Sequence, residues 1–175
     1  MGVQAFFETI CIFLSSSYIL STYHLTTTPN TTRRRTMIEK TLVILKPDAM
    51  QQNLAGTIIE RFAKAGLTLA ACKMMQLNES ILREHYDFLA DKPFFPNILA
   101  YMQECPVLVM VLKGESAIGC VRSLLGPTDS SIAPKGTIRG DFGKDKSRNV
   151  VHASDSETSA QREISRFFKS NEIFG

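Results

Sequence analysis

Along the chain after Met37, apolar residues follow two spacings, and each spacing predicts a different kind of element. Unbroken apolar runs at residues 42–45 and 107–112 are too short for helices and predict buried strands; residues 67–77 and 149–152 predict two more. Apolar residues three and four apart predict helices over residues 54–65, 79–90, 98–103, 117–125 and 156–169. The order β-α-β, helical insertion, β-α, long loop, β-α predicts an α/β sandwich of the split β-α-β kind.

Residues 126–148 follow neither spacing and hold four glycines and Pro134. A segment of this length without regular structure inside a compact domain is usually functional or disordered. It is therefore the first place to look for polar residues with a function.

Residues 1–36 differ in composition from the rest of the chain, so we expect a flexible N-terminal extension followed by one domain over residues 37–175. The apolar run at residues 5–20 contains Glu8 and is shorter than the roughly 20 residues that a membrane-spanning helix needs. Arg33 to Arg35 follow this run, whereas a secretory signal carries its positive charge before it. Two explanations stay open: a Ser-rich, Arg-bearing organelle transit peptide, or an upstream start-codon assignment with the true start at Met37.

The charge and the cysteines exclude several classes of partner and site. The formal net charge is +3, and residues 1–36 hold three arginines and one acid, so the rest of the chain carries +1. We therefore expect no nucleic-acid partner and no membrane partner. Four cysteines without a Cys-x-x-Cys pair favour reduced thiols and argue against a zinc site. We expect a cytoplasmic protein, imported into an organelle if residues 1–36 are a transit peptide.

Several polar residues lie at predicted strand ends or beside the apolar stripes of helices. Lys46 follows four buried apolar residues, at the edge where α/β folds place ligands. His152 ends a short apolar strand, and the helix that follows it offers an N-terminus that suits anions. Glu163 lies beside the apolar stripe of that helix, where a charge needs a partner. A nucleophilic histidine oriented by a carboxylate accounts for both; a structural core histidine with a glutamate at the rim is the alternative.

Two arginines are further candidates for binding an anion. Arg122 flanks the apolar stripe of its predicted helix, and Arg139 lies in the long irregular segment between Gly136 and Gly140, where a backbone can come close to an anion. Taken alone, Arg122 is better explained as an arginine whose stem covers apolar surface while its head stays in water, and Arg139 as a solvated loop charge.

Lys46, Arg122, Arg139 and His152 fall within a set of six motifs. The motifs are Leu45-Lys46-Pro47-Asp48, His85-Tyr86, Lys92-Pro93-Phe94-Phe95, Arg122 with Gly126-Pro127-Thr128, Gly136-Thr137-Ile138-Arg139-Gly140-Asp141-Phe142, and Asn149-Val150-Val151-His152-Ala153-Ser154-Asp155-Ser156. On these motifs, the stretch from Glu39 to Phe168 closely resembles the nucleoside diphosphate kinases. The last two motifs are highly specific.

The resemblance implies a ferredoxin-like fold, with a four-stranded antiparallel sheet covered by helices, and a homo-oligomer, either a tetramer or a hexamer. It implies transfer of the γ-phosphate from a nucleoside triphosphate, typically ATP, to a nucleoside diphosphate through a phosphohistidine on His152. Tyr86 and Glu163 would support the histidine, and Mg²⁺ would arrive on the nucleotide phosphates rather than on a protein cluster. The nucleotide contacts implied in the same way are Lys46, Phe94, Arg122, Thr128, Arg139 and Asn149.

The departures from the family pattern are small. Ala153 stands where many members have glycine, and the chain ends at Gly175 without the longer tail of some members, which leaves tetramer and hexamer open. A phosphohistidine relay or a regulatory nucleotide-binding protein is the alternative function. The complete polar set argues against a binding module without chemistry, which would typically have lost the nucleophile or its cations.

Overall fold

A computed structural model describes residues 37–175 of the chain. The N-terminal extension lies outside this range, so both explanations of it stay predictions. In the described part, no helix is long and apolar enough to cross a membrane.

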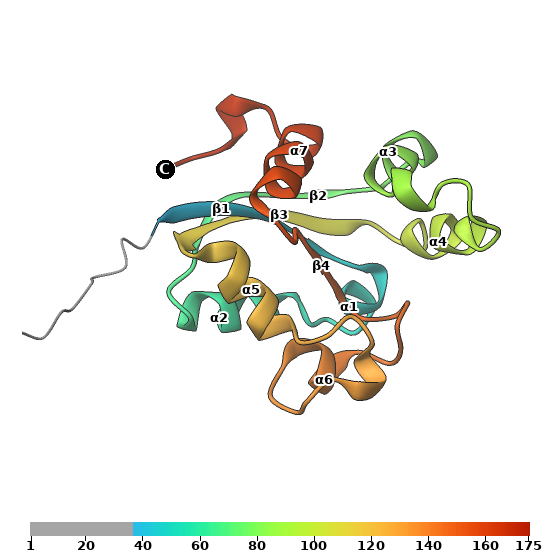
Figure 1. The fold of residues 1–175 in the computed structure, drawn as a ribbon, viewed down its shortest axis with the longest axis horizontal. Coiled ribbons are helices and arrows are strands. Elements are labelled where there is room, and N and C mark those ends of the chain that lie inside the picture. Colours follow the sequence, from blue (N-terminus) through green and yellow to red (C-terminus); the bar gives the residue numbers. More distant parts are fainter. Residues whose placement is uncertain (1–36) are drawn as a thin grey trace, which may run out of the picture. The chain divides into compact units, whose positions relative to one another are not determined.

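The strands form one antiparallel sheet in the order β2-β3-β1-β4 (Figure 1). The strands are β1 (Ile38–Leu45), β2 (Thr68–Met75), β3 (Val107–Glu115) and β4 (Val151–Ala153). The α-helices are α1 (Pro47–Gln51), α2 (Ala55–Lys64), α3 (Glu79–His85), α4 (Phe95–Met102), α5 (Ala117–Leu125), α6 (Ile138–Phe142) and α7 (Glu157–Phe167). The 3₁₀ turns are η1 (Asp87–Leu89), η2 (Ser130–Ile132) and η3 (Ser170–Glu172). This arrangement confirms the predicted antiparallel sheet covered by helices in the ferredoxin-like order.

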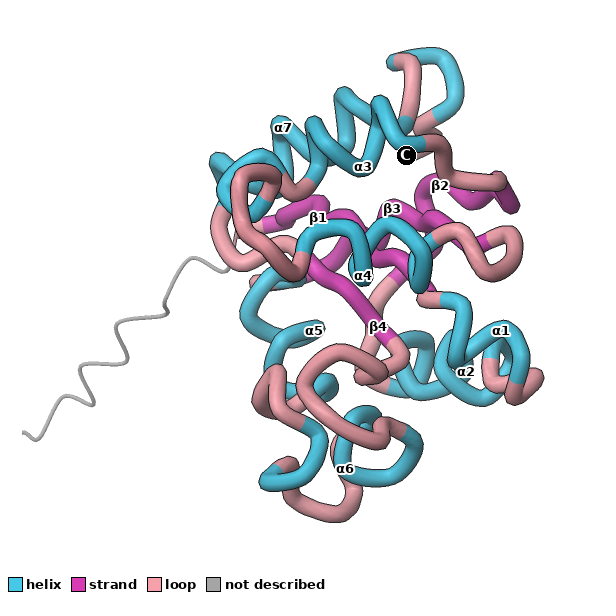
Figure 2. The backbone as a smooth tube through the Cα atoms, turned by 90° about the vertical axis from the view of Figure 1, so that its right-hand side faces the viewer, coloured by secondary structure: helices cyan, strands magenta, loops and turns pink. Residues whose placement is uncertain are grey.

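Alternate residues of the central strands face two different helical layers. Leu42 and Ile44 of β1 pack in one apolar cluster with residues of α3, α4 and α7. Val43 and Leu45 pack in a second cluster with residues of α1, α2, α5 and α6. Figures 1 and 2 show α3 and α7 on one side of the sheet and α2, α5 and α6 on the other. Because β1 and β3 are covered on both faces, their sequences are the unbroken apolar runs noted above.

The irregular segment at residues 126–148 is more ordered than predicted. It contains η2 and the five-residue helix α6, which begins where Thr137 Oγ1 accepts a hydrogen bond of 3.1 Å from Gly140 N–H. One helical turn is too short to show a 3.6-residue period in a sequence. The capping hydroxyl and the packing of Ile138 in the second cluster form this helix instead.

Other element boundaries also differ from the prediction. The helix predicted over residues 79–90 ends at His85 and continues only as η1, so Phe88 is 70% exposed rather than part of an apolar face. α4 begins at Phe95, three residues early, because Pro96 is tolerated in a first turn. The strand predicted at residues 149–152 is β4, which begins only at Val151 because Val150 has a positive φ. Helix α1 was not predicted. Asn78 is the N-cap of α3, with a side chain that accepts a hydrogen bond from Ile81 N–H, and Gly66 after α2 has a positive φ.

Candidate active site

His152 lies in the middle of β4, paired with Ile44 of β1, and its side chain is 20% exposed. Its Nε2 is 3.1 Å from Oε2 of Glu163 on α7. Ser156 starts α7 by accepting a hydrogen bond of 3.2 Å from Ser159 N–H, which fixes the helix directly after β4. The short link between strand and helix therefore sets the carboxylate beside the imidazole, as the sequence predicted.

The Glu163 carboxylate also accepts a 2.7 Å hydrogen bond from Ser154 Oγ. Burial acts to raise the pKa of Glu163, but the hydrogen bonds from His152 and Ser154 outweigh it and hold the pKa below its usual value. An ionised carboxylate can only accept, so His152 donates its Nε2–H. This tautomer leaves the lone pair of the neutral imidazole on Nδ1.

His85 packs edge-on against His152, with 4.5 Å between the ring centroids. Burial and then the neighbouring His152 lower the pKa of His85 far below its usual value, so the ring is neutral. Arg166 Nη1 lies 3.3 Å from His85 Nδ1, and a guanidinium only donates, so the ring hydrogen is on Nε2.

His85, His152 and Glu163 offer ligand atoms within 4.8 Å of one another, and the tautomer of His85 decides whether they fit a metal ion. A protonated Nε2 has no lone pair to give, and Nδ1 faces the Arg166 guanidinium. The three residues therefore do not fit a metal site. Their nitrogen-rich donor set is also unlike the oxygen set that Mg²⁺ prefers.

Tyr86 is buried, with its ring centroid 6.3 Å from that of His152. Burial and then the charge of Glu163 raise the pKa of Tyr86, so the phenol stays protonated. Its ring packs edge-on against His85, with 4.7 Å between centroids. Tyr86 is thus next to the candidate nucleophile, with the His85 ring also in the cluster.

Lys46, Asn149 and Thr128 are joined by hydrogen bonds. Lys46 Nζ donates to Asn149 Oδ1 at 2.7 Å, and Asn149 Nδ2 donates to the Thr128 carbonyl at 2.9 Å. Burial is the main cause that lowers the pKa of Lys46 to about 8. The structure thus brings together Lys46 after β1, Thr128 after α5 and Asn149 before β4.

Arg139 is buried in α6 rather than exposed in an irregular loop. Its Nη2 donates to the Val151 carbonyl at 2.8 Å and its Nη1 to the Gly126 carbonyl at 2.9 Å, so the guanidinium lies next to the backbone of His152. Burial and then the nearby charge of Arg122 lower the pKa of Arg139 to about 10, so Arg139 stays charged at neutral pH. Arg122 is exposed on α5.

Phe94 stands apart from the other candidates. It precedes α4, its ring is 50% exposed, and within residues 37–175 no hydrogen bond or ring contact joins it to another candidate residue. An exposed aromatic ring is open to a planar partner, but its place relative to His152 is not set by direct contact.

Sequence analysis assigned no role to Asp48 or Val150, although both contact the candidate residues. Asp48 is buried and accepts a 3.0 Å hydrogen bond from Val150 N–H. Val150 has φ +60°, a conformation that costs on the order of 1–3 kcal/mol. The available signal was an aspartate three residues after a buried strand, where a buried polar side chain needs hydrogen-bond partners.

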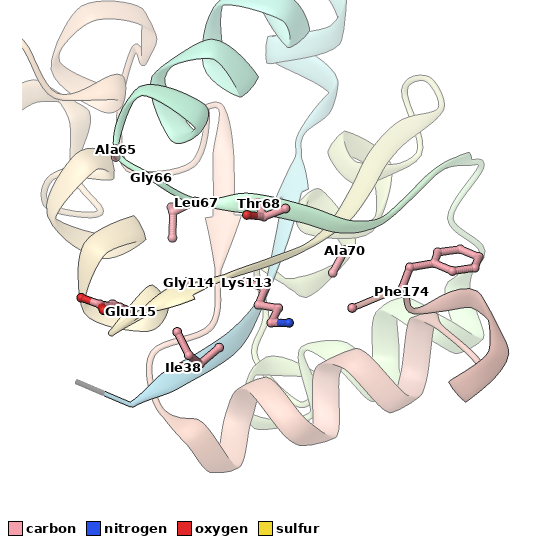
Figure 3. Close-up of a pocket in the computed structure, with 11 residues that line it drawn as sticks. Ile38, Ala65, Gly66, Leu67, Thr68, Ala70, Lys113, Gly114, Glu115 and Phe174 are labelled. Carbon is pink, nitrogen blue, oxygen red and sulfur yellow. The ribbon is translucent and has the colours of Figure 1, made fainter. Parts of the chain in front are cut away.

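A pocket of about 530 Å³ lies elsewhere, beside the start of β2 and the end of β3 (Figure 3). Its lining includes Thr68, Lys113 and the C-terminal residues Phe174 and Gly175, and none of the candidate residues. This pocket is therefore separate from the candidate site, which the grouping of polar residues locates.

Comparisons with known proteins point in one direction. A family model described as nucleoside diphosphate kinase matches residues 39–173. A nucleoside diphosphate kinase of Methanobrevibacter smithii is 49% identical over 137 residues, which is 78% of this chain and 91% of that protein. A protein of Columba livia named nucleoside diphosphate kinase, mitochondrial, is 50% identical over 135 residues, or 77% of this chain and 75% of that one.

A solved structure gives the same result for the fold. The nucleoside diphosphate kinase of Halobacterium salinarum, determined in complex with CDP, superposes with a TM-score of 0.77 at 40% identity. The match covers 79% of this chain and 93% of the other.

Proposed function

The chain belongs to the nucleoside diphosphate kinase family, and we propose that it transfers the terminal phosphoryl group of a nucleoside triphosphate to a nucleoside diphosphate through His152. The observation that carries the proposal is the 3.1 Å contact between His152 Nε2 and the ionised Glu163, which directs the lone pair of Nδ1 outward for attack.

In the first half-reaction, His152 Nδ1 attacks the γ-phosphorus and the bond from phosphorus to the β,γ-bridging oxygen breaks. The nucleoside diphosphate leaves with that electron pair, and Nδ1 carries the phosphoryl group. In the second half-reaction, a terminal oxygen of another diphosphate attacks the same phosphorus and the N–P bond breaks. Glu163 stabilises the positive charge that the imidazole gains, through the Nε2–H hydrogen bond.

Positioned cations supply most of the catalysis, because the transferred group spreads negative charge over its oxygens. Arg139 is held by two backbone carbonyls next to His152, and we assign it and Arg122 to the phosphates. Lys46, Asn149 and the Thr128 hydroxyl complete the polar contacts to the phosphates and the sugar. Mg²⁺ bound together with the nucleotide would supply further charge neutralisation at the phosphates.

Phe94 is assigned to the base. Its half-exposed ring can stack on any purine or pyrimidine, since stacking needs only a π-face. A wide range of nucleotides as substrates follows from this contact.

We also infer that the chain forms a homo-oligomer. β2 is an edge strand of eight residues, and Leu69 and Met74 on it are 46% and 62% exposed. Edge strands with exposed apolar side chains readily pair with another chain. A second copy of β2 is the partner that this edge suits.

The function is tested with γ-labelled ATP and Mg²⁺, using the full chain and a His152→Asn variant of similar size. We expect the wild type to acquire acid-labile, base-stable phosphate that GDP, UDP and CDP each discharge as the triphosphate. The variant is expected to acquire none while still binding nucleotide.

Two results would contradict the proposal. Label that no nucleoside diphosphate discharges would instead indicate a phosphohistidine relay. Equal labelling of wild type and His152→Asn would place the nucleophile elsewhere.

A further inference from the structure

We propose that Asp48 is a positioning residue for phosphoryl transfer, because its carboxylate holds the strained turn at Val150 that lies between Asn149 and His152. This inference rests on the proposed function, since it gives Asp48 a part in the same reaction. Asp48 would fix the positions of neighbouring site residues and would not itself contact the substrate.

Val150 has a conformation that its side chain disfavours. Its φ is +60°, in the left-handed region where the Cβ of a branched residue crowds the backbone. Across it, Val151 N–H donates to the Asn149 carbonyl at 2.7 Å, the hydrogen bond of a classic γ-turn, which is rare. Such a residue persists only where its surroundings over-determine it.

The segment after β1 provides those surroundings. Val150 N–H donates to Asp48 Oδ2 at 3.0 Å, and the Val150 carbonyl accepts from Lys46 N–H at 2.9 Å. Both backbone polar groups of the strained residue are therefore held from one side. The Lys46 side chain, meanwhile, bonds Asn149 at 2.7 Å, so one segment fixes the turn and a neighbouring candidate residue together.

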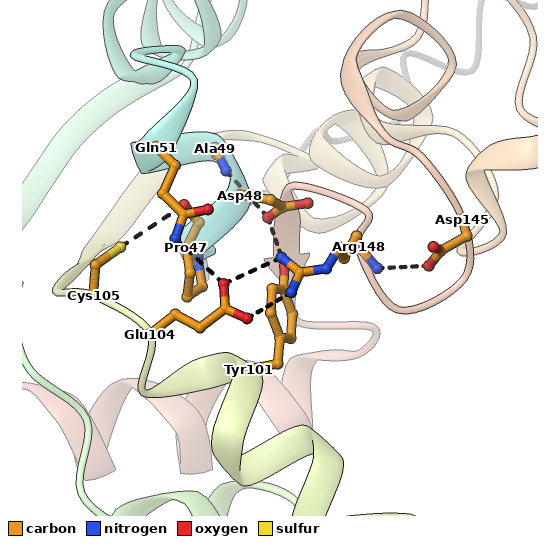
Figure 4. Close-up of polar contacts among 9 residues, drawn as sticks. All are labelled: Pro47, Asp48, Ala49, Gln51, Tyr101, Glu104, Cys105, Asp145 and Arg148. Carbon is orange, nitrogen blue, oxygen red and sulfur yellow. Dashed lines mark hydrogen bonds and ion pairs between the residues drawn. The ribbon is translucent and has the colours of Figure 1, made fainter.

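Asp48 is itself fixed in place (Figure 4). Its Oδ1 accepts hydrogen bonds from Tyr101 Oη at 2.6 Å and from Ala49 N–H at 3.1 Å. Arg148 lies over the Tyr101 ring, 4.8 Å from its centroid, and bonds both carboxylate oxygens of Glu104. With three donors on a buried carboxylate, Asp48 cannot swing away from Val150.

Without this acceptor, Val150 N–H would be buried and unpaired, and the residue could relax to a negative φ. The relaxation would turn the peptide groups that lead to Asn149 on one side and to His152 on the other. A displacement of about 1 Å at a reacting group can slow a reaction by about 100-fold.

The test is Asp48→Asn, which keeps the size of the side chain but offers one acceptor oxygen to three donors. In single-turnover experiments, we expect phosphorylation of His152 to slow by about tenfold to a hundredfold per folded molecule. The dissociation constant for ATP should change far less. A residue with only a structural role would lower the melting temperature and leave the rate of the folded fraction unchanged.

Tyr101→Phe is the matched control. It removes the 2.6 Å donor to Oδ1 but leaves Oδ2 in contact with Val150. We expect a loss of stability with much less effect on the rate. Slowing by Tyr101→Phe as large as that by Asp48→Asn would overturn the specific role of the Val150 contact.

Val150→Gly supplies the decisive background, because glycine adopts positive φ without strain. Asp48→Asn is expected to slow transfer several times less in this background than in the wild type. Equal slowing in both backgrounds would contradict the proposal. The single Asp48→Asn variant could fail to fold. In that case we expect the double variant with Val150→Gly to fold, and a double variant that does not fold would contradict the proposal.

A crystal structure of the Asp48→Asn protein separates this proposal from the proposed function. We expect Val150 to take a negative φ and the bond between Val151 N–H and the Asn149 carbonyl to be lost; a retained turn overturns the role of Asp48. This outcome does not depend on whether the wild type transfers phosphate. Absence of labelling in the wild type contradicts the proposed function, while full transfer by Asp48→Asn contradicts only the positioning role.

Discussion

At the scale of single residues, the site sets protonation states through burial and hydrogen bonds. Burial, partly offset by the charge of Asp48, lowers the pKa of Lys46 to about 8. Bound phosphates favour the ammonium form, so the affinity of the free enzyme for nucleotide should depend on this proton.

We therefore expect kcat/KM to fall as pH rises through about 8, the pKa of Lys46. Lys46→Met should lower kcat/KM at neutral pH and abolish this inflection. Folding stability should change in the opposite direction: between about 8 and the usual 10.5, the unfolded chain holds a proton that the folded chain has lost. Stability of the wild type relative to Lys46→Met should thus rise over this range, measured by urea unfolding. If the difference in unfolding free energy between wild type and Lys46→Met did not change with pH over this range, the pKa of Lys46 would not be lowered by folding.

Phe94→Ala tests the assignment of the base contact. Loss of one stacking partner should weaken nucleotide binding by about 1–3 kcal/mol, measured by calorimetry on the His152→Asn background to prevent turnover. Phosphorylation of His152 at high ATP should remain, because the ring is not tied to the polar residues. Unchanged affinity would show that the base does not stack on Phe94.

At the scale of elements, the position of α6, which carries Arg139, depends on close backbone contact at Gly140. A Cβ at this position would lie 2.0 Å from the Pro134 carbonyl oxygen, so the loop must shift to accept it. Gly140→Ala should destabilise the protein by about 1–3 kcal/mol and weaken nucleotide binding through Arg139. Thermal unfolding and nucleotide titration measure the two effects.

Gly119→Ala is the control for the same change. Gly119 lies on the exposed side of α5, and a Cβ there meets nothing within 4 Å. Alanine in a helix interior should stabilise the protein by about 0.5–1 kcal/mol without affecting the site. If both glycines responded alike, backbone entropy rather than close contact would explain the Gly140 effect.

The elements also show which features a sequence can predict. β1 and β3 could be predicted because both faces of each strand are buried, which leaves a continuous apolar run. α1 and α6 could not, because five residues give no helical period; α1 also lacks a capping side chain. The pair of His152 and Glu163 was predictable because one short strand and one helix join them. The contact of Asp48 with Val150 was not predictable, because the two residues are 102 positions apart in the sequence. Val150 also has a positive φ, which the propensity of valine disfavours.

At the scale of the whole molecule, β2 forms one edge of the sheet. β2 presents Leu69 and Met74 to solvent, and pairing of this edge with a second copy would cover them. We expect sedimentation equilibrium to give a mass that is a multiple of 19.5 kDa. Met74→Lys should reduce that mass, because charges on an edge strand oppose pairing. A wild type of single-chain mass would contradict the inferred oligomer.

The central claim is that His152 carries the phosphoryl group on Nδ1, and the most direct measurement identifies the phosphorylated atom. The enzyme is incubated with ATP and Mg²⁺, and the denatured phosphoprotein is analysed by ³¹P NMR in base together with peptide mass spectrometry. We predict one phosphate, on His152, as the Nδ1 isomer, because Nε2 is bound to Glu163 at 3.1 Å. The Nε2 isomer would contradict the orientation of the ring, and phosphate on any other residue would contradict the account as a whole.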